Sequence, residues 1–552
     1  MTNTVLQRSK IYEMMLHKTE KTKKGIFYTN NIDIIKYMIS NINVLCGKIL
    51  EPSCGSGIFL IFIIEEIIKQ LRVKNYSELE ILEYISNNIY ANDIDRNAIK
   101  IAKTQVELIL EPLISQVKLK QEKFEFKGIT FTNYDFVFER EKFGCKFDLI
   151  VGNPPFVTMY GKRSKGMTEE KREYFNTFNF VKNKKGNNKF NLNMFFIENS
   201  LKSLKFNGIM SFILDISFLE DAYIDLREYL LNHTKISNYT YNINGFESVG
   251  SGQIILNLEN IKNEDYTVNT FDYLEKINKI HHIKKWKTSK KYKFSIPLDE
   301  IESNIIDKIK QHPKLDEIFK NKSLRTCCAL TGRTDDFITS LKAKDNNDVF
   351  PYIEGSKGLS GRFSKLTPFR NIKYNYDLQI KISDEFKVEL GKKGIKNKKR
   401  VTLGDKECYL KPKIFIRQSA KELIATYTED KIMANNSIYI LTDNKGDGID
   451  SKKKLKYVCG LINSNLLTYY ALKTEIIRSG IGKIPQLKIS DLKQLPILIV
   501  EKKMETIIKI TEDLLNNINY EENFEKLNNE IYNIYNMTFE ERNIIESTIN
   551  RN

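Results

Sequence analysis

Short apolar runs alternate with stretches of helical periodicity through the first 260 residues, and this alternation constrains the fold more than any other feature. Apolar runs of roughly four to eight residues are typical of buried strands, and longer periodic stretches are typical of helices. Their alternation predicts an α/β domain built on one sheet. The predicted strands span residues 48–52, 89–93, 129–132, 147–151, 208–214, 236–241 and 253–258, and the predicted helices span 57–71, 96–110, 192–204 and 221–231.

The chain has 552 residues, which is too long for one ordinary core and predicts at least two domains. We predict a first domain over residues 1–264, a linker region over 265–299 where lysines cluster, and a second, α+β domain over 300–552. The second domain is predicted to begin with a helix at 300–319 and to end in packed helices. A polar stretch at 162–189 is predicted to be a long loop, of the kind that is usually functional or disordered.

The positive charge of the chain is concentrated in one segment of its second half. The whole chain has a net charge of +17, and residues 351–500 alone carry 29 basic and 15 acidic side chains, a net of +14. A bias toward lysine in the coding sequence would spread the charge evenly. The segment therefore predicts a surface for a polyanion, with lysines contacting phosphates and arginines such as Arg417 or Arg478 as candidates for reading a base edge.

Several classes of protein are excluded by simple patterns. The longest apolar run, residues 58–64, is far shorter than the roughly 20 residues that a membrane helix needs. The charged N-terminal region lacks the apolar stretch of a signal peptide, and the seven cysteines form no CxxC pair. We therefore expect a cytoplasmic, reduced protein that binds no membrane and no structural metal.

A glycine-rich turn joins the first predicted strand to the first predicted helix, in the sequence Glu-Pro-Ser-Cys-Gly-Ser-Gly at residues 51–57. Glycines in such a turn let a ligand approach the backbone, and the N–H groups of the following helix face that ligand. The pattern is not GxGxxG, which argues against a dinucleotide. Glu51 would repel a pyrophosphate and suits a cofactor with a positive group, such as a methionine derivative carrying an ammonium and a sulfonium.

Two further acidic positions follow the next predicted strands. An acid at the end of the second strand can hold a ribose diol by two hydrogen bonds, so we assign Asp93 to a ribose and Asp95 to the cap of the following helix. Asp135 follows the third strand and could accept a hydrogen bond from an adenine amino group. Taken alone, a loop aspartate is more often a turn residue.

The most informative motif is Asn153-Pro154-Pro155-Phe156, directly after the predicted strand at 147–151. The two prolines fix the backbone and remove two donors, so that acceptors remain. The side-chain oxygen of Asn153 and the carbonyl oxygen of Pro154 can then accept both hydrogens of an exocyclic amine. This lets the nitrogen become tetrahedral as it attacks a methyl group, while Phe156 stacks on the ring that carries the amine. We infer these four residues to be catalytic.

Together these motifs resemble the S-adenosylmethionine-dependent amino-methyltransferases, and specifically the gamma class of DNA adenine-N6 methyltransferases, which are TaqI-like. Their order supports that class: residues 25–29 (Gly-Ile-Phe-Tyr-Thr), then the glycine-rich turn, then the Asn-Pro-Pro-Phe motif, then a recognition region. The resemblance implies a Rossmann-like methyltransferase domain with a mixed sheet, a C-terminal target-recognition domain, and double-stranded DNA as the partner. Because the first motif begins at residue 25, we expect methylation without cleavage.

The resemblance also implies roles for individual residues. Phe196 is expected to form a wall against the adenine of the cofactor, and Phe246 is expected to stack on the flipped base opposite Phe156. The implied contacts to S-adenosylmethionine are Tyr28, Thr29, Glu51, Ser53, Cys54, Gly55, Gly57, Asp93, Ile94, Asp135, Phe136, Asn153 and Phe196.

Two alternatives stay open at this point. One is an amino-methyltransferase of the same superfamily that acts on RNA or on a protein glutamine, although the glutamine-modifying members are usually shorter and lack a basic second half. The other is a non-catalytic DNA-binding subunit of a modification system. The complete glycine-rich turn and the intact Asn153–Phe156 motif favour a catalyst.

Overall fold

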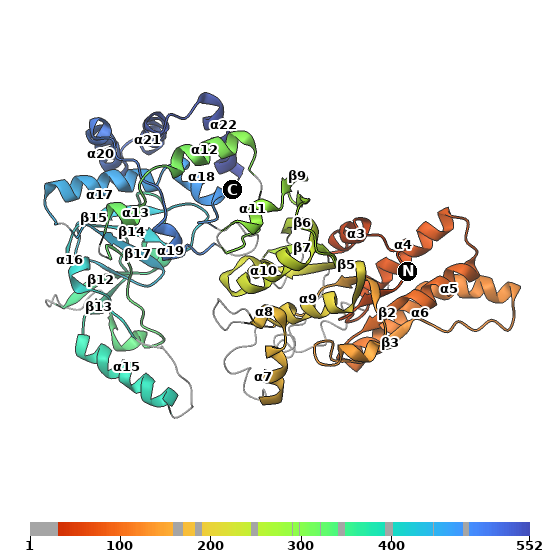
Figure 1. Ribbon diagram of the computed structural model, residues 1–552. Helices are drawn as coiled ribbons and strands as arrows, with labels where there is room; N and C mark the ends of the chain where they lie inside the picture. The colour runs from red at the N-terminus through yellow and green to blue at the C-terminus, as the bar shows by residue number, and fades with distance from the viewer. Residues whose placement is uncertain are drawn as a thin grey trace. The chain divides into compact units, whose positions relative to one another are not determined.

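The computed structural model describes residues 31–157, 169–182, 190–243, 252–289, 291–296, 298–320, 322–340, 348–391, 401–444, 446–477 and 485–551 (Figure 1). The chain divides into two compact units, with the main division between residues 297 and 298. No helix among the described residues is both long enough and apolar enough to cross a bilayer.

The first unit is built on a nine-stranded mixed sheet, which confirms the predicted fold class. The strand order is β3-β2-β1-β4-β5-β7-β6-β8-β9, and β1 to β5 run parallel while β7 lies antiparallel between β5 and β6. All seven predicted strands are present. The strands are β1 (Ile49–Glu51), β2 (Ile89–Asn92), β3 (Thr130–Thr132), β4 (Phe147–Gly152), β5 (Leu204–Asp215), β6 (Lys235–Ile243), β7 (Gln253–Glu259), β8 (Thr267–Asp272) and β9 (Ile277–His282).

Helices bury both faces of this sheet, which is why its parallel strands read as continuous apolar runs. One apolar cluster joins the sheet to α3 (Ile32–Ser40), α4 (Ile58–Val73), α5 (Glu78–Asn88) and α6 (Arg96–Lys120). The other cluster joins it to α7 (Glu169–Asn176), α8 (Asn179–Lys182), α9 (Leu192–Ser203) and α10 (Ile224–His233). Helices α7 and α8 lie within the stretch that we predicted to be a loop.

Two of the predicted helices have different bounds in the structure, and in both cases the difference lies near a proline. We ended a helix at residue 110, but α6 continues through Pro112 to Lys120, because its buried face repeats through Leu113, Ile114 and Val117. The helix predicted at 300–319 is instead two helices, α12 (Glu300–Lys310) and α13 (Leu315–Ile318), separated by Pro313. Proline removes a backbone donor and disfavours helical geometry in the preceding residue, so the break at Pro313 has a local cause.

Residues 265–299, which we predicted to be a linker region, contribute two strands and a short helix, α11 (Lys284–Lys287), to the first unit. Strand β8 pairs parallel with β6, and β9 pairs antiparallel with β8. Alternate residues of β8 are buried, including Val268 and Thr270, and Trp286 of α11 is fully buried. Among the lysines that suggested a linker, Lys284, Lys285 and Lys291 are exposed residues of this packed segment.

The second unit is an α+β domain with terminal helices, as predicted. It contains two four-stranded sheets, with orders β10-β17-β14-β15 and β11-β13-β12-β16. These strands are β10 (Leu324–Thr326), β11 (Ile338–Thr339), β12 (Val349–Ile353), β13 (Arg370–Lys373), β14 (Lys413–Arg417), β15 (Ala425–Thr428), β16 (Met433–Ala434) and β17 (Ile438–Thr442). Besides α12, its longer helices are α15 (Tyr376–Gly391), α17 (Ile449–Ile462), α18 (Asn465–Lys473), α20 (Glu501–Leu515), α21 (Tyr520–Ile534) and α22 (Phe539–Arg551).

Candidate active site

The predicted site residues meet at the carboxyl ends of four adjacent parallel strands. Glu51 ends β1, Asp93 follows β2, Asp135 follows β3 and Asn153 follows β4. Strand order reverses between β1 and β4, because β2 and β3 lie on one side of β1 while β4 and β5 lie on the other. In open α/β sheets the crevice at such a switch point is where ligands bind.

The glycine-rich turn has the conformation that its glycines predict. Gly55 has a φ of +52° and Gly57 a φ of +90°, which are unfavourable for residues with a side chain. A Cβ on Gly57 would also lie 3.0 Å from the Cβ of Ala102 on α6. The turn is held by hydrogen bonds from the Gly57 N–H to the Cys54 carbonyl and from the Cys54 N–H to the Asn92 carbonyl, both 2.8 Å.

Asp93 holds this turn in place with its side chain. One carboxylate oxygen accepts a 2.8 Å hydrogen bond from the Gly55 N–H, and the other accepts a 2.8 Å bond from the Asp95 N–H. Burial raises the pKa of Asp93, and the two backbone donors partly offset this. Each carboxylate oxygen has two lone pairs, so a ribose contact remains available. Asp95 caps α6 by accepting from the Asn97 N–H at 2.9 Å, which confirms its predicted role.

Glu51 is buried beside the turn with only 2% of its surface exposed. Among the described residues, its Oε2 atom has no hydrogen-bond partner. Burial raises the pKa of Glu51 well above its ordinary value, and the nearby Asp93 charge raises it further. A Cβ on Gly152 of β4 would lie 3.4 Å from the Glu51 Cγ, so a glycine there leaves room for this side chain. A buried acid with an unsatisfied oxygen fits a cationic ligand.

Asn92 joins two of the loops in the site, although no sequence pattern predicted a role for it. Its Nδ2 donates to the carbonyl oxygens of Pro52 and Tyr134, both at 3.0 Å. Its Oδ1 accepts from the Thr132 hydroxyl and from the Tyr134 N–H, both at 2.9 Å. With 1% of its surface exposed, Asn92 is a buried positioning residue that connects the glycine-rich turn to the loop carrying Asp135.

Phe136 and Phe196, which we predicted to contact the cofactor, lie together. Their ring centroids are 5.1 Å apart, and both side chains are buried. The buried Asn199 of α9 donates to the carbonyl oxygens of both Phe136 and Val137 at 2.9 Å, so α9 holds this loop. The Asp135 side chain accepts from the Val137 N–H at 3.0 Å, which gives it a role in the turn as well.

The Asn153–Phe156 motif leaves β4 through Gly152 and lies next to the glycine-rich turn. The Ser53 hydroxyl donates to the Asn153 carbonyl oxygen at 3.3 Å, which links the two motifs directly. Pro154 is buried, while Asn153, Pro155 and Phe156 are half-buried. Ile94, predicted to contact the cofactor, follows Asp93 and is 66% exposed, which leaves an apolar surface available.

Some predicted residues lie outside the described part of the chain, or have other partners within it. Tyr28, Thr29, Phe246 and Arg478 lie outside the described residues, so their roles stay predictions. Arg417 donates to the carbonyl oxygens of Ser419 at 2.8 Å and of Ser360 at 3.0 Å. These contacts give Arg417 a structural role and make it a poor candidate for reading a base.

Comparison with known proteins gives matches in both units. Residues 87–247 match the Eco57I restriction-modification methylase family, and residues 370–497 match the TaqI-like C-terminal specificity domain. The two units thus resemble the two parts of TaqI-like restriction-modification methylases. The first match contains the Asn153–Phe156 motif, and the second contains β13 to β17.

Two curated restriction-modification methyltransferases match the chain over part of their length. The type II methyltransferase M.VspI of Vibrio sp. (strain 343) is 25% identical over 224 residues, covering 40% of this chain and 43% of that protein. The type II methyltransferase M.BstVI of Geobacillus stearothermophilus is 24% identical over 221 residues, covering 38% and 37%. The chain thus spans less than half the length of these relatives.

Two solved structures share the fold over most of this chain. The type IIL restriction-modification enzyme MmeI, in complex with DNA, superposes with a TM-score of 0.62 and 12% identity, covering 96% of this chain and 78% of that one. A nuclease-deletion mutant of the type ISP enzyme LlaGI, with a DNA substrate mimic, superposes with a TM-score of 0.56 and 13% identity, covering 89% and 47%.

Proposed function

We propose that this protein transfers a methyl group from S-adenosylmethionine to the N6 atom of an adenine that is flipped out of double-stranded DNA. The observation that carries the proposal is the Asn153–Phe156 motif at the carboxyl end of β4, linked through Ser53 to the glycine-rich turn. A motif suited to an exocyclic amine and a turn suited to a cationic cofactor therefore lie side by side. The matches to restriction-modification families and the DNA-bound structures of the same fold support DNA as the substrate.

The residues of the site fit S-adenosylmethionine. Glu51, buried with an unsatisfied oxygen, would bind the ammonium group, and Asp93 would accept from the ribose hydroxyls. Phe136, Phe196 and the exposed Ile94 would pack against the adenine. When bound, this cofactor supplies an electrophilic methyl group.

The protein must hold the target amine and take its nitrogen lone pair out of conjugation with the ring. The Asn153 side-chain oxygen and the Pro154 carbonyl oxygen would accept the two N–H groups of the amine. This favours a tetrahedral nitrogen, whose lone pair points at the methyl carbon as the N–C bond forms and the S–C bond breaks. The nitrogen is then positively charged and loses one proton to solvent. Phe156, and Phe246 from outside the described residues, would stack on the flipped base.

The proposal is tested by modification-sensitive sequencing of DNA from cells that express the protein. We expect N6-methyladenine at one short recognition sequence. The cytosine N4 amine has similar chemistry, and its methylation would keep the reaction type but correct the base. An absence of any methylated motif, with S-adenosylmethionine still bound by the purified protein, would favour a non-catalytic subunit.

A single substitution separates the reaction from cofactor binding. Asn153→Ala removes one preorganised acceptor for the target amine, so we expect methyl transfer to fall by roughly 10²–10³-fold. The affinity for S-adenosylmethionine, measured by calorimetry, should stay near that of the wild type. Near-normal turnover of the variant would contradict the role assigned to Asn153.

A further inference from the structure

The segment that follows β8 is unusual in charge, and the proposed site does not use it. Residues 276–293 contain eight lysines, two histidines and no acidic residue. We call this stretch the lysine segment. It belongs to the first unit, outside the basic region at 351–500 that the sequence analysis assigned to a polyanion. Its charge is therefore a second feature that requires an explanation.

The lysine segment is packed against the first unit through Trp286. This side chain is fully buried, stacks on Phe294 with ring centroids 4.2 Å apart, and contacts Tyr239 edge-on at 5.6 Å. Its indole N–H donates to the Ser295 carbonyl oxygen at 2.8 Å. Because the tryptophan fixes α11, the neighbouring lysines occupy defined positions on the surface.

Three acidic residues near α11 have basic or histidine partners. Asp265 pairs with His282 at 2.5 Å, Glu264 with Lys262 at 3.0 Å, and Asp221 with Lys291 at 2.9 Å. An ordinary solvated surface interleaves both signs of charge, whereas this one has no acidic residue over 18 positions. These three carboxylates already have partners.

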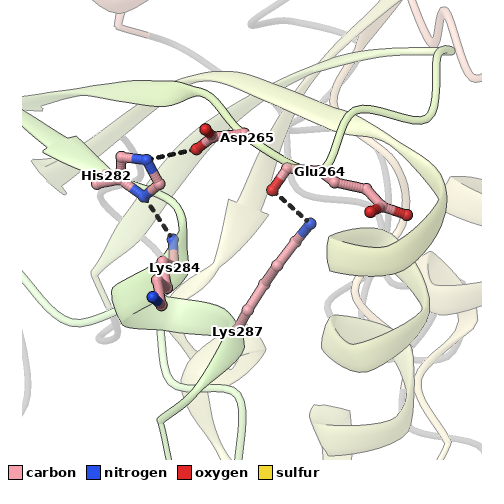
Figure 2. A pocket seen from close by; sticks show the side chains of 5 residues that line it. All are labelled: Glu264, Asp265, His282, Lys284 and Lys287. Carbon is pink, nitrogen blue, oxygen red and sulfur yellow. Dashed lines mark hydrogen bonds and ion pairs between the residues drawn. The ribbon is translucent and has the colours of Figure 1, made fainter.

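Lys284 and Lys285 have no such partners. Both are exposed, and among the described residues neither ammonium group has a hydrogen-bond or ion-pair partner. Figure 2 shows the adjoining surface hollow of about 480 Å³, lined by Glu264, Asp265, His282, Lys284 and Lys287. There the Lys287 ammonium reaches the backbone carbonyl of Glu264, at 3.2 Å, while the Glu264 carboxylate points away from it.

We infer that the lysine segment, through Lys284 and Lys285 of α11, is a second DNA-binding surface that contacts the phosphate backbone of duplex DNA. The inference rests on the proposed function for its choice of polyanion. Lysine side chains act as point charges toward phosphate, so this surface adds affinity for any sequence and no base specificity. It would let the catalytic unit contribute to DNA binding along with the specificity domain.

The test compares Lys284→Gln/Lys285→Gln with Lys103→Gln/Lys118→Gln in the full-length protein. The control pair lies exposed on α6 of the same unit and removes the same charge. Binding of a fluorescent duplex of arbitrary sequence is measured by anisotropy over a range of salt concentrations. The plot of log affinity against log salt has a slope of roughly 0.9 per phosphate contact, so losing two contacts should flatten it by about 1.8.

We expect this flattening for the α11 pair only, and we expect Lys284→Arg/Lys285→Arg to keep the wild-type slope. In a methyl-transfer assay the glutamine pair should raise KM for DNA while leaving kcat unchanged. Equal slopes for the two glutamine pairs would overturn the inference. It would also be overturned if Lys284→Gln/Lys285→Gln bound phosphatidylserine vesicles more weakly than the wild type but bound DNA equally well. If the wild type methylates no DNA, the proposed function fails. A difference in slope between the α11 and α6 glutamine pairs would still support the lysine segment as a DNA-binding surface.

Discussion

Glu51→Gln is expected to weaken cofactor binding while making the protein without cofactor more stable. The substitution keeps the size of the side chain and removes its charge. In the structure the Glu51 Oε2 atom is buried without a partner among the described residues, so an ionised carboxylate is unfavourable there until a cation binds. A residue that served only the fold would not show opposite effects on stability and binding.

The size of each effect follows from the charge. Hydrogen bonds to charged groups contribute about 1.5–3 kcal/mol, so the affinity for S-adenosylmethionine should fall by about ten- to a hundredfold. Burial raises the pKa of Glu51 in the folded protein above its ordinary value of 4.5. The wild type therefore loses stability relative to Glu51→Gln as the pH rises above 4.5, by about 1.4 kcal/mol for each unit by which the pKa is raised.

The assays are urea unfolding between pH 4.5 and 8 and calorimetry of cofactor binding in buffers of different ionisation enthalpy. Wild-type binding should release a proton, because the bound ammonium favours the ionised Glu51, and the variant should not. The exposed Glu107→Gln on α6 is a control that should change neither property. Wild-type affinity in Glu51→Gln, or an unfolding free energy below the wild type at pH 8, would refute the reasoning.

Two further predictions concern buried polar residues. Asn92→Ala should lower cofactor affinity by about 1–3 kcal/mol, because it leaves backbone groups of two site loops, such as the Pro52 carbonyl and the Tyr134 N–H, without their partner. Binding of non-specific DNA should stay unchanged. Wild-type cofactor affinity in calorimetry would contradict the positioning role of Asn92. Burial, together with Lys285 and His282, lowers the pKa of His281 to about 4. The folded protein should therefore lose stability as the pH falls from 6.5 toward 4. By urea unfolding, the stability of His281→Phe relative to the wild type should be about 2 kcal/mol greater at pH 5 than at pH 8.

The sheet was predictable from sequence because its strands are buried on both faces and therefore appear as apolar runs. Strands β8 and β9 were not predicted, because their alternate positions carry threonine, asparagine and lysine and resemble a loop. Helix α5 was also missed, although its capping box at Ser77 and Glu80 is a sequence signal for a helix start. Helix α6 extends beyond its predicted end at residue 110, because its buried face continues past Pro112.

A site residue was predictable from sequence where its role depends on its position at the end of a strand, and not where its role depends on contacts that are distant in sequence. Glu51, Asp93 and Asn153 could be found because a parallel strand ends just before each of them or at it. The partners of Asn92 could not be found, because they come from loops about 40 residues away on either side of it. The double role of Asp93, which holds Gly55 while remaining available to a ribose, also depends on this tertiary contact.

The contrast between Glu51 and other buried charges in the same unit shows why this acid marks a ligand site. Arg227 is 1% exposed, yet its guanidinium donates to the carbonyl oxygens of Tyr292 at 3.0 Å, Glu220 at 2.9 Å and Lys291 at 3.1 Å. A buried charged side chain with a structural role thus has hydrogen-bond partners within the protein. Glu51 is equally buried, but one of its oxygens has no partner among the described residues, at the carboxyl end of β1 where the strand order reverses. The missing partner is therefore expected to come from a cationic ligand, and the stability that Glu51 costs without cofactor should be recovered when S-adenosylmethionine binds.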